Sequence, residues 1–170
     1  KWKKKADMPT ARKELSACVV NGRIYAVGGK NGDGLCSEVE EYDPTNDKWT
    51  KKSKMPTARN YLSISAVGKK IYALGGADKP DFLQVAVSTI EEYDTETDKW
   101  TKKDDMPTSR LTFAISTVNN KIYVMGGLNK FGPGWITYST LEEYDPQIKS
   151  ESVNSKGKLP NTWGKLKQNK

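Results

Sequence analysis

The sequence lacks histidine altogether, which removes several kinds of active site from consideration. A copper or iron site with imidazole ligands is excluded, and Ser, Thr or Cys nucleophiles would have no imidazole base to activate them. Cysteine is scarce too, because Cys18 and Cys36 are too few for a disulfide scaffold and do not have the spacing of metal ligands. We therefore expect neither a bound metal nor a cofactor.

Long hydrophobic runs are also missing. No apolar stretch approaches the roughly 18 to 20 residues that a membrane-spanning helix needs, and the mean hydropathy is −0.75. The hydrophobic fraction of 35% is low for a globular chain, so a large core is not expected. We expect a soluble chain with no membrane partner, and no targeting signal is legible that would choose between a cytoplasmic and an extracellular location.

Basic charge is concentrated at the two ends. The net charge is +7, but residues 1–5 carry +4 and residues 146–170 carry +5, whereas residues 6–145 carry −2. The only aromatic residue in the basic C-terminal segment is Trp163, which is no platform of stacked aromatic side chains. The pattern therefore argues against a nucleic-acid partner.

What the sequence does contain is a threefold repeat. The string EEYD occurs at 40–43, 91–94 and 142–145, glycine pairs occur at 28–29, 75–76 and 126–127, and a Lys-Trp pair followed by Met-Pro-Thr begins at 1, 48 and 99. Each of these tryptophans precedes the next glycine pair by 26 residues, and in the two complete cases the EEYD aspartate precedes the tryptophan by six. The length varies only between glycine pair and EEYD, where 10, 14 and 14 residues intervene.

Each repeat predicts four short strands. Two β-rich runs separated by a two-residue turn, such as the run 61–67 and the run that begins at 71, indicate a hairpin. The turns are 21–22, 68–69 and 119–120, whose Asn and Gly residues tolerate positive φ. The EEYD segment predicts a third strand and the KWTKK segment a fourth. Four antiparallel strands in about 50 residues form one blade of a β-propeller.

These signals resemble those of the kelch family. Within the galactose oxidase/kelch superfamily, the chain resembles a bacterial-type kelch protein. The resemblance covers residues 1 to about 145 and implies an all-β fold of three four-stranded antiparallel blades in an open arc, a partial propeller. It assigns structural roles to residues that recur in every repeat: Gly28, Gly29, Gly75, Gly76, Gly126, Gly127, Tyr42, Tyr93, Tyr144, Trp2, Trp49, Trp100, Arg12, Arg59 and Arg110. Large aromatic side chains at equivalent places supply apolar area that holds one blade on the next.

The repeats divide the chain at about 10–55, 56–106 and 107–150, preceded by an outer strand at 1–5. The third repeat breaks down after EEYD, because Glu151 stands where a Trp is expected, and we expect 151–170 to be a degenerate basic tail without a convincing fourth strand. Three blades cannot close a ring, since propellers have at least four. Either the remaining blades belong to a longer parent chain, which we favour, or a second copy completes a six-bladed ring by sharing terminal strands.

Candidate binding residues are those that differ among the repeats. The loops 30–39, 77–89 and 128–140 follow the glycine pairs, and long loops on a rigid scaffold are where binding residues concentrate. In kelch proteins the turn after the repeated arginine and the loop after the glycine pair open on the same face of the ring. The two regions together supply the candidate ligand-binding residues Glu14, Tyr61, Thr112, Asp33, Phe82, Phe131, Trp135 and Tyr138. The alternative is that the loop aromatics fold back onto neighbouring blades.

The repeated arginines and acidic pairs have a structural interpretation. Because the arginines recur at one position, we expect each to pair with a repeated acidic residue such as Glu41, Glu92 or Glu143, and not with a ligand. Neighbouring residues of a strand point to opposite faces, so one glutamate of each pair would meet the arginine and the other would meet water.

We therefore expect a non-enzymatic interaction module that binds a protein or a glycan through loops on one face. One alternative is a carbohydrate-active kelch enzyme, such as a sialic acid mutarotase, with Arg and carboxylates lining the channel. Another is a structural repeat segment of a larger surface protein. A pocket with convergent Arg, Glu and Tyr would favour the enzyme, and a rim of exposed aromatics would favour the binder.

Overall fold

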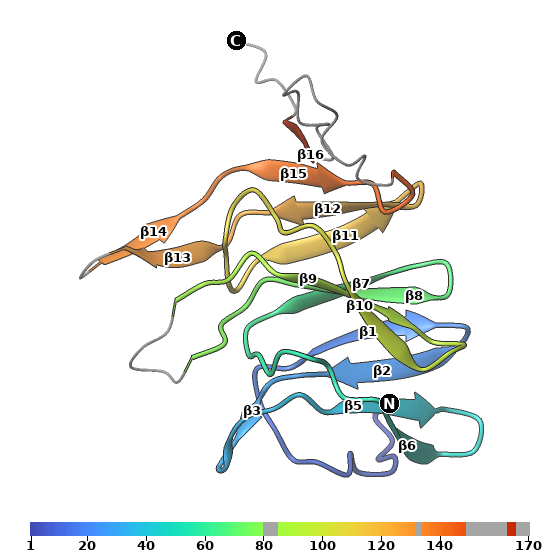
Figure 1. Cartoon of the computed structure of the whole chain (residues 1–170). Helices are drawn as coiled ribbons and strands as arrows, with labels where there is room; N and C mark the ends of the chain where they lie inside the picture. Colours follow the sequence, from blue (N-terminus) through green and yellow to red (C-terminus); the bar gives the residue numbers. More distant parts are fainter. Residues whose placement is uncertain (80–84, 132–133, 149–162, 166–170) are drawn as a thin grey trace.

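The computed structural model describes residues 1–79, 85–131, 134–148 and 163–165, with the side chains of residue 131 and of 163–165 left out. Three four-stranded antiparallel sheets are stacked one above the next along the chain (Figure 1). This arrangement confirms the predicted all-β fold of three blades in an open arc. No helix in the described part of the chain is long and apolar enough to cross a membrane.

Each blade is a sheet whose strands follow one another in sequence from the inside outward. The first blade consists of β1 (Ser16–Val20), β2 (Arg23–Val27), β5 (Val39–Asp43) and β6 (Lys48–Lys52), and the second of β7 (Ser63–Val67), β8 (Lys70–Leu74), β9 (Ile90–Asp94) and β10 (Lys99–Lys102). The third consists of β11 (Ala114–Val118), β12 (Lys121–Met125), β15 (Leu141–Tyr144) and β16 (Trp163–Lys165). Two small hairpins lie between the second and third strands of a blade: β3 (Lys30–Asn31) with β4 (Gly34–Leu35), and β13 (Leu128–Phe131) with β14 (Gly134–Thr137).

The inner hairpins turn at the predicted positions. In the first blade Asn21 and Gly22 have φ of 50° and 74°, and in the third Asn119 and Asn120 have φ of 51° and 61°. Left-handed φ at both central residues matches the right-handed twist of the flanking strands, and Asn and Gly adopt it at low cost. The turn chemistry therefore fixes the register of the hairpins, in which Ser16 pairs with Val27 and Ala114 with Met125.

The third blade has a fourth strand, which the sequence analysis did not expect. β16 pairs with β15 so that Trp163 lies opposite Tyr144, in the register that places Trp49 opposite Tyr42 and Trp100 opposite Tyr93. The tryptophan follows Asp145 by 18 residues instead of six, so the repeat is interrupted by an insertion. Part of the segment expected to be a degenerate tail thus belongs to a blade.

The N-terminal segment has no such pairing. Residues 1–5 form no strand with any described residue, and Trp2 is fully exposed. In the resemblance to kelch propellers, this segment would complete one blade together with strands from the other end of the chain. Its role as an outer strand therefore stays a prediction.

The two larger hydrophobic clusters of the core each lie at a boundary between blades. Between the first two blades, Tyr25, Val27 and Val39 pack against Met55 and Ile71. Between the second and third blades, the corresponding cluster comprises Tyr72, Leu74, Ile90, Met106, Phe113, Ile122, Val124 and Tyr144. Because each cluster is only one blade interface wide, a hydrophobic fraction as low as 35% is sufficient to build it.

Two pairs of the repeated aromatic residues contact each other within a blade. The rings of Tyr42 and Trp49 contact each other at a tilt of 41° with centroids 5.0 Å apart, and those of Tyr93 and Trp100 at a tilt of 36° and 5.1 Å. The Trp49 indole N–H donates to the carbonyl of Ala6 at 3.0 Å, which fixes the segment before the first blade on that blade's outer strand.

Each repeated arginine is buried in an ion pair, but with the other glutamate of the predicted pair. Arg12 contacts Glu40 at 2.5 Å, Arg59 contacts Glu91 at 2.8 Å and Arg110 contacts Glu142 at 2.7 Å. The expectation of Glu41, Glu92 and Glu143 was wrong, because those residues point to the opposite face of the sheet. There they accept hydrogen bonds from Tyr25, Tyr72 and Tyr123, so they do not simply meet water.

The double glycine is required where a loop crosses closely over its neighbours. Gly28 has φ of 67°, and a Cβ placed on it would lie 2.7 Å from the carbonyl oxygen of Arg59 in the next blade. Gly29 has φ of 98°, and its Cβ would lie 2.6 Å from the carbonyl oxygen of Lys13. Both positions therefore exclude any side chain, and they bring the following loop against the rim of the propeller.

Candidate functional site

The three loops after the glycine pairs leave the blades on the same side, at the left in Figure 1, away from the short turns of the inner hairpins. An isolated β-bridge joins each loop to the turn after the repeated arginine: Lys13 with Lys30, Asn60 with Ala77, and Leu111 with Leu128. The structure thus brings together the two regions that the sequence analysis grouped. We call the surface made by residues 13–14, 60–61 and 111–112 and by the described residues of the three loops, which are 30–39, 77–79, 85–89, 128–131 and 134–140, the loop face.

Three predicted residues occupy equivalent, strained positions on this face. Glu14, Tyr61 and Thr112 have φ of 59°, 53° and 53°, in the left-handed region that such residues rarely adopt. The amide of Tyr61 donates to the carbonyl of Glu14 at 3.1 Å, and the amide of Thr112 donates to the carbonyl of Tyr61 at 3.1 Å. A chain of backbone hydrogen bonds therefore runs from blade to blade, and it presents three unlike side chains on one fixed backbone.

In the first blade the loop face carries a charged cluster. The Glu14 carboxylate accepts a hydrogen bond from the Asn60 amide at 2.7 Å and lies 3.3 Å from Lys30 Nζ. A depression of about 350 Å³ beside this cluster is lined by Lys13, Lys30, Asn31, Gly32, Asp33, Gly34 and Leu35. Predicted residues Glu14 and Asp33 therefore lie at one site with both signs of charge.

Tyr61 is half-buried and connects the charged cluster to an apolar one. Its ring lies 6.0 Å from Lys30 Nζ, a cation–π distance. It also packs against a small cluster formed by Ala77, Ala86 and Leu111. Its position is thus fixed on both sides, which suits a contact residue that loses little entropy on binding.

In the third blade the predicted aromatic residues have different environments. Trp135, on the arm made by β13 and β14, is 53% exposed, and its neighbour Ile136 is exposed as well. Tyr138 instead folds back, with its ring centroid 5.2 Å from the buried guanidinium of Arg110. The side chain of Phe131 and all of Phe82 lie outside the described residues. The alternative of aromatics folded onto a blade therefore applies to Tyr138 and not to Trp135.

The sequence analysis included three residues of the loop face within its candidate regions but did not single them out as contact residues. Lys30, Asn60 and Asn129 are drawn into this face by the β-bridges and by hydrogen bonds, such as that from Asn129 to Ser109 at 2.9 Å. The only signal for Lys30 and Asn60 was their place directly after a glycine pair or a repeated arginine.

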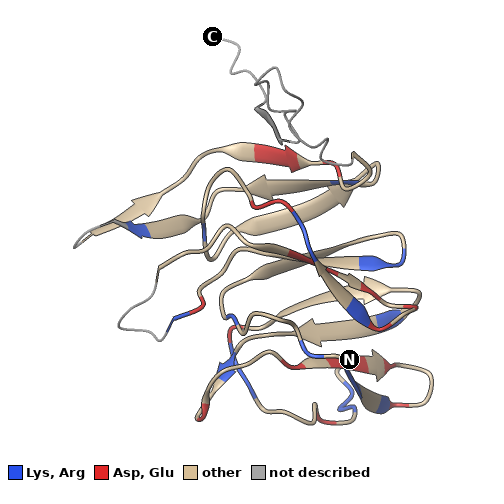
Figure 2. Cartoon of the chain, in the orientation of Figure 1, with Lys and Arg blue, Asp and Glu red and all other residues tan. Residues whose placement is uncertain are grey.

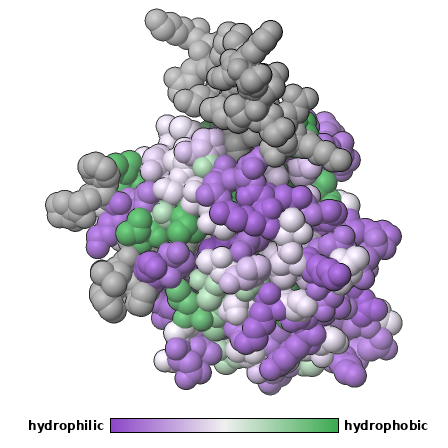
Figure 3. All heavy atoms as spheres, viewed as in Figure 1, coloured by the Kyte–Doolittle hydropathy of each residue, from purple (hydrophilic) through white to green (hydrophobic). Residues whose placement is uncertain are grey.

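Figure 3 shows hydrophobic side chains gathered mostly toward the loop side, whereas the opposite side is largely hydrophilic.

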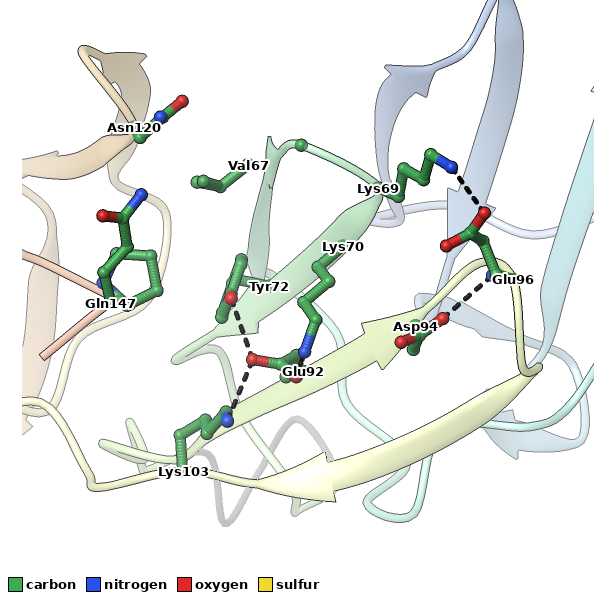
Figure 4. Close-up of a pocket in the computed structure, with 12 residues that line it drawn as sticks. Val67, Lys69, Lys70, Tyr72, Glu92, Asp94, Glu96, Lys103, Asn120 and Gln147 are labelled. Atoms are coloured by element: carbon green, nitrogen blue, oxygen red, sulfur yellow. Dashed lines mark hydrogen bonds and ion pairs between the residues drawn. The ribbon is translucent and has the colours of Figure 1, made fainter. Parts of the chain in front are cut away.

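The opposite surface, which carries the short hairpin turns, contains a larger cleft between the second and third blades. The cleft has a volume of about 580 Å³, and Figure 4 shows Lys69, Lys70, Glu92, Glu96 and Lys103 around it. Lys69 pairs with Glu96 at 2.5 Å, and Glu92 contacts Lys70 at 2.5 Å and Lys103 at 2.9 Å. The charges in the cleft therefore neutralise one another.

These polar contacts in the cleft shift pKa values, among them those of Tyr72 and Glu92. Burial raises the pKa of Tyr72, and its hydrogen bond to Glu92 raises it further. Burial also raises the pKa of Glu92, but hydrogen bonds from Lys70, Lys103 and Tyr72 outweigh that effect, so the pKa of Glu92 is lowered. The tyrosine stays protonated and the carboxylate stays ionised at neutral pH.

The Tyr–Glu contact is repeated in every blade, which identifies it as part of the scaffold. Tyr25 donates to Glu41 at 2.9 Å, Tyr72 to Glu92 at 2.8 Å and Tyr123 to Glu143 at 2.7 Å. Figure 2 shows basic and acidic segments interleaved over the whole arc, with no extended region of one sign. The loop face, where the repeats differ, is therefore the better candidate for a binding site.

Comparison with known proteins agrees with this architecture. The family model described as the KLHDC2/KLHL20/DRC7 Kelch-repeats domain matches residues 1–161. The chain is 30% identical to Beta-scruin of Limulus polyphemus over 86% of its length and 28% identical to Kelch-like protein 25 of Xenopus tropicalis over 94%. It covers 16% and 27% of those two relatives, so it spans only a small part of their length.

A solved structure, titled "Structure of YjhT", has a similar fold. It matches with a TM-score of 0.64 and 22% sequence identity, over 74% of this chain and 37% of that one. At this identity the match concerns the fold alone. It shows that the stacked blades have the arrangement found within a larger chain.

Proposed function

The chain belongs to the kelch-repeat family, and from that premise we propose that it is an interaction module whose loop face binds a protein partner. The observation that carries the proposal is that three different side chains project from the same fixed backbone conformation in the three blades. Glu14, Tyr61 and Thr112 share one backbone conformation and one hydrogen-bonded chain, yet differ in charge, size and polarity. Such a scaffold keeps its geometry while its contact residues vary, as expected of a binding surface.

A protein partner suits the chemistry of the loop face better than a sugar does. Trp135 and Ile136 are neighbours on an exposed arm, and an exposed aliphatic side chain beside an aromatic one suits apolar anchors of a protein. The charged cluster of Glu14, Lys30 and Asp33 supplies polar contacts at the first blade. The combination of an apolar anchor with flanking polar groups is typical of protein interfaces.

The burial of the three repeated arginines argues against the enzyme alternative. A carbohydrate-active site of the kind considered above needs Arg and carboxylate groups that converge on the channel. The guanidinium groups of Arg12, Arg59 and Arg110 are each fully buried and paired within a blade. They hold the scaffold together and are not available to a substrate.

The proposal is tested by selecting binders to the chain from a random peptide library and by probing a glycan array in parallel. We expect peptides to be selected, and their affinity to fall at least tenfold, about 1.4 kcal/mol, for Trp135→Ala and for Thr112→Arg. Lys69→Ala on the opposite surface serves as the control and should leave the affinity unchanged. Selection of no peptide, or an equal loss with Lys69→Ala, would contradict the proposal, and binding only to glycans would assign the face to sugars.

A further inference from the structure

The outer face of the third blade is incomplete by comparison with the other two blades. Val27 and Leu74, on the first two blades, are completely buried by the blade that follows, whereas their equivalent Met125 is 38% exposed. Likewise Ile90 is completely buried and its equivalent Leu141 is 39% exposed. The apolar face that each internal boundary uses is thus present on the third blade, but among the described residues no following blade covers it.

The backbone of the third blade also has the groups with which the other two blades form hydrogen bonds to the blade that follows. At the first internal boundary Gly29 N–H donates to Arg59 O at 2.8 Å, and at the second Gly76 N–H donates to Arg110 O at 2.9 Å. The equivalent amide, that of Gly127, has no such partner in the described part of the chain. The amide of Gly127 is therefore positioned to receive the carbonyl of an incoming arginine.

Two carbonyl groups beside it continue the pattern. Ser37 O and Ser88 O accept the amides of Met55 and Met106, each at 2.8 Å. Cys36 O and Val87 O accept the amides of Arg59 and Arg110, each at 3.3 Å. Their equivalents by position are Ser139 O and Tyr138 O. At each internal boundary, therefore, one blade forms hydrogen bonds with the backbone of a Met-Pro-Thr-x-Arg segment of the next blade. The third blade has the equivalent amide and carbonyl groups.

The space around Gly126, at the edge of the third blade, is open where the equivalent space in the other two blades is filled. A Cβ on Gly28 would lie 2.7 Å from Arg59 O, and one on Gly75 would lie 2.5 Å from Arg110 O. A Cβ on Gly126 would meet only Tyr138 O, at 3.4 Å. The space that an incoming arginine carbonyl fills at the internal boundaries is open here.

The chain itself carries a segment that fits this face. Residues 8–12 read MPTAR, which is identical to residues 55–59, the segment that fills the first internal boundary. Met8 and Leu15 are only half-buried, whereas their equivalents Met55 and Leu62 are almost fully buried. The amides of Met8 and Arg12 have no backbone partner among the described residues.

We propose that the third-blade face, centred on Met125, Gly126, Gly127 and Leu141, binds residues 8–15 of a second copy of this chain. Three blades span half of a six-bladed ring, so two copies related by a twofold axis along the channel make the same contact twice and close the ring. The contact continues the two internal boundaries: Arg12 O of the partner copy accepts from Gly127 N, and Thr112 O accepts from the partner's Glu14 N. The partner thereby extends the backbone chain of the loop face.

The pairing of β16 with β15 changes how such a ring is held together. β16 already occupies the outer edge of the third blade, so the ring does not require residues 1–5 of one copy to supply that strand to the other. Docking of whole blade faces is sufficient. This differs from the strand sharing that the sequence analysis gave as its alternative to a longer parent chain.

The test is the mass of the 170-residue chain in solution, by sedimentation equilibrium from about 1 to about 100 µM. We expect a species of twice 19.0 kDa. Gly126→Ala and Leu141→Lys at one end, and Leu15→Lys at the other, should each raise the dimer dissociation constant at least tenfold. Gly68→Ala has the same left-handed strain in open surroundings and Val85→Lys introduces a charge at an exposed site elsewhere, so these controls should remain dimeric.

Circular dichroism and thermal melting of each variant separate loss of the dimer from loss of the fold. A chain that is monomeric at about 100 µM would overturn the proposal and assign the face to further blades of a longer chain. A dimer that persists in Gly126→Ala, Leu141→Lys and Leu15→Lys would overturn it as well, because the copies would then meet elsewhere. Assemblies larger than two copies would contradict closure of the ring.

Discussion

The guanidinium of Arg59 lies 2.8 Å from the carboxylate of Glu91, and both side chains are almost completely removed from solvent. The same arginine donates to the carbonyl oxygens of Gly75, Thr89 and Ala73 at 2.7, 3.0 and 3.3 Å. One side chain from the segment that begins the second blade thus satisfies a backbone group on β8 and one at each end of the loop between β8 and β9. The ion pair fixes the entry segment to its own blade.

Removing the carboxylate of this pair leaves a buried charge without its partner. We expect Glu91→Ala to lower the free energy of unfolding by about 3 to 5 kcal/mol, measured by urea denaturation. The matched control is Glu96→Ala, which breaks the exposed pair with Lys69 and should cost less than about 1 kcal/mol. Similar losses for the two variants would contradict the structural role of the buried pair.

The repeat made these ion pairs predictable in kind but not in detail. Two neighbouring glutamates at each EEYD segment point to opposite faces of the sheet, and a period of two residues does not say which face meets the arginine. Only the path of the segment 55–59 over the blade decides that Glu91 and not Glu92 is the partner. Fold and strand count, by contrast, follow from identical strings at fixed spacing.

The sequence was least informative where the repeats differ. Tyr144 and Trp163 are paired in one sheet, but Trp163 follows Asp145 by 18 positions instead of six, and this longer spacing hides the fourth strand from any search at fixed spacing. The left-handed backbone at Glu14, Tyr61 and Thr112 had no sequence signal at all, because none of the three is Gly or Asn. The surrounding hydrogen bonds impose that conformation.

A second prediction concerns the glycines at the internal blade boundaries. Gly75 has φ of 57°, and a Cβ there would come within 2.9 Å of atoms of Arg110, Phe113 and Met106. We expect Gly75→Ala to destabilise the chain by several kcal/mol, because both the backbone strain and the overlap must be relieved. Gly68 has φ of 59° with nothing within 4 Å, so Gly68→Ala should cost only about 1 to 2 kcal/mol. Equal melting temperatures would show that strain, not packing, sets the cost.

A third prediction concerns stability at acidic pH. Burial raises the pKa of Glu92, but contacts with Lys70, Lys103 and Tyr72 bring it below its ordinary 4.5 in the folded chain. A lowered folded pKa stabilises the fold above the unfolded pKa, and this contribution is lost as the pH falls through the folded value. We therefore expect the free energy of unfolding to fall below about pH 4.5, and to fall less steeply in Glu92→Gln. Parallel urea titrations from pH 7 to pH 3 measure this, and identical slopes would contradict it.

A fourth prediction separates strain from function at the rim. Thr112 is exposed, β-branched and held at φ of 53°, a conformation that glycine adopts without cost. Thr112→Gly should therefore leave the chain as stable or raise its stability by up to about 1 kcal/mol, after the greater freedom of glycine in the unfolded chain is subtracted. A loss of more than about 1 kcal/mol in thermal unfolding would mean that the threonine side chain supports the fold.

The last prediction concerns the two aromatic side chains of the third loop, which the sequence analysis treated alike and the structure separates. Trp135 is 53% exposed, so Trp135→Ala should change the free energy of unfolding by no more than about 1 kcal/mol. Tyr138 covers the buried guanidinium of Arg110, and Tyr138→Ala should cost about 1 to 2 kcal/mol more, because a cation–π contact with a desolvated charge is lost. Chemical denaturation of both variants gives the comparison. A large loss with Trp135→Ala would make that tryptophan part of the core, and the loop face would then lose its main apolar anchor.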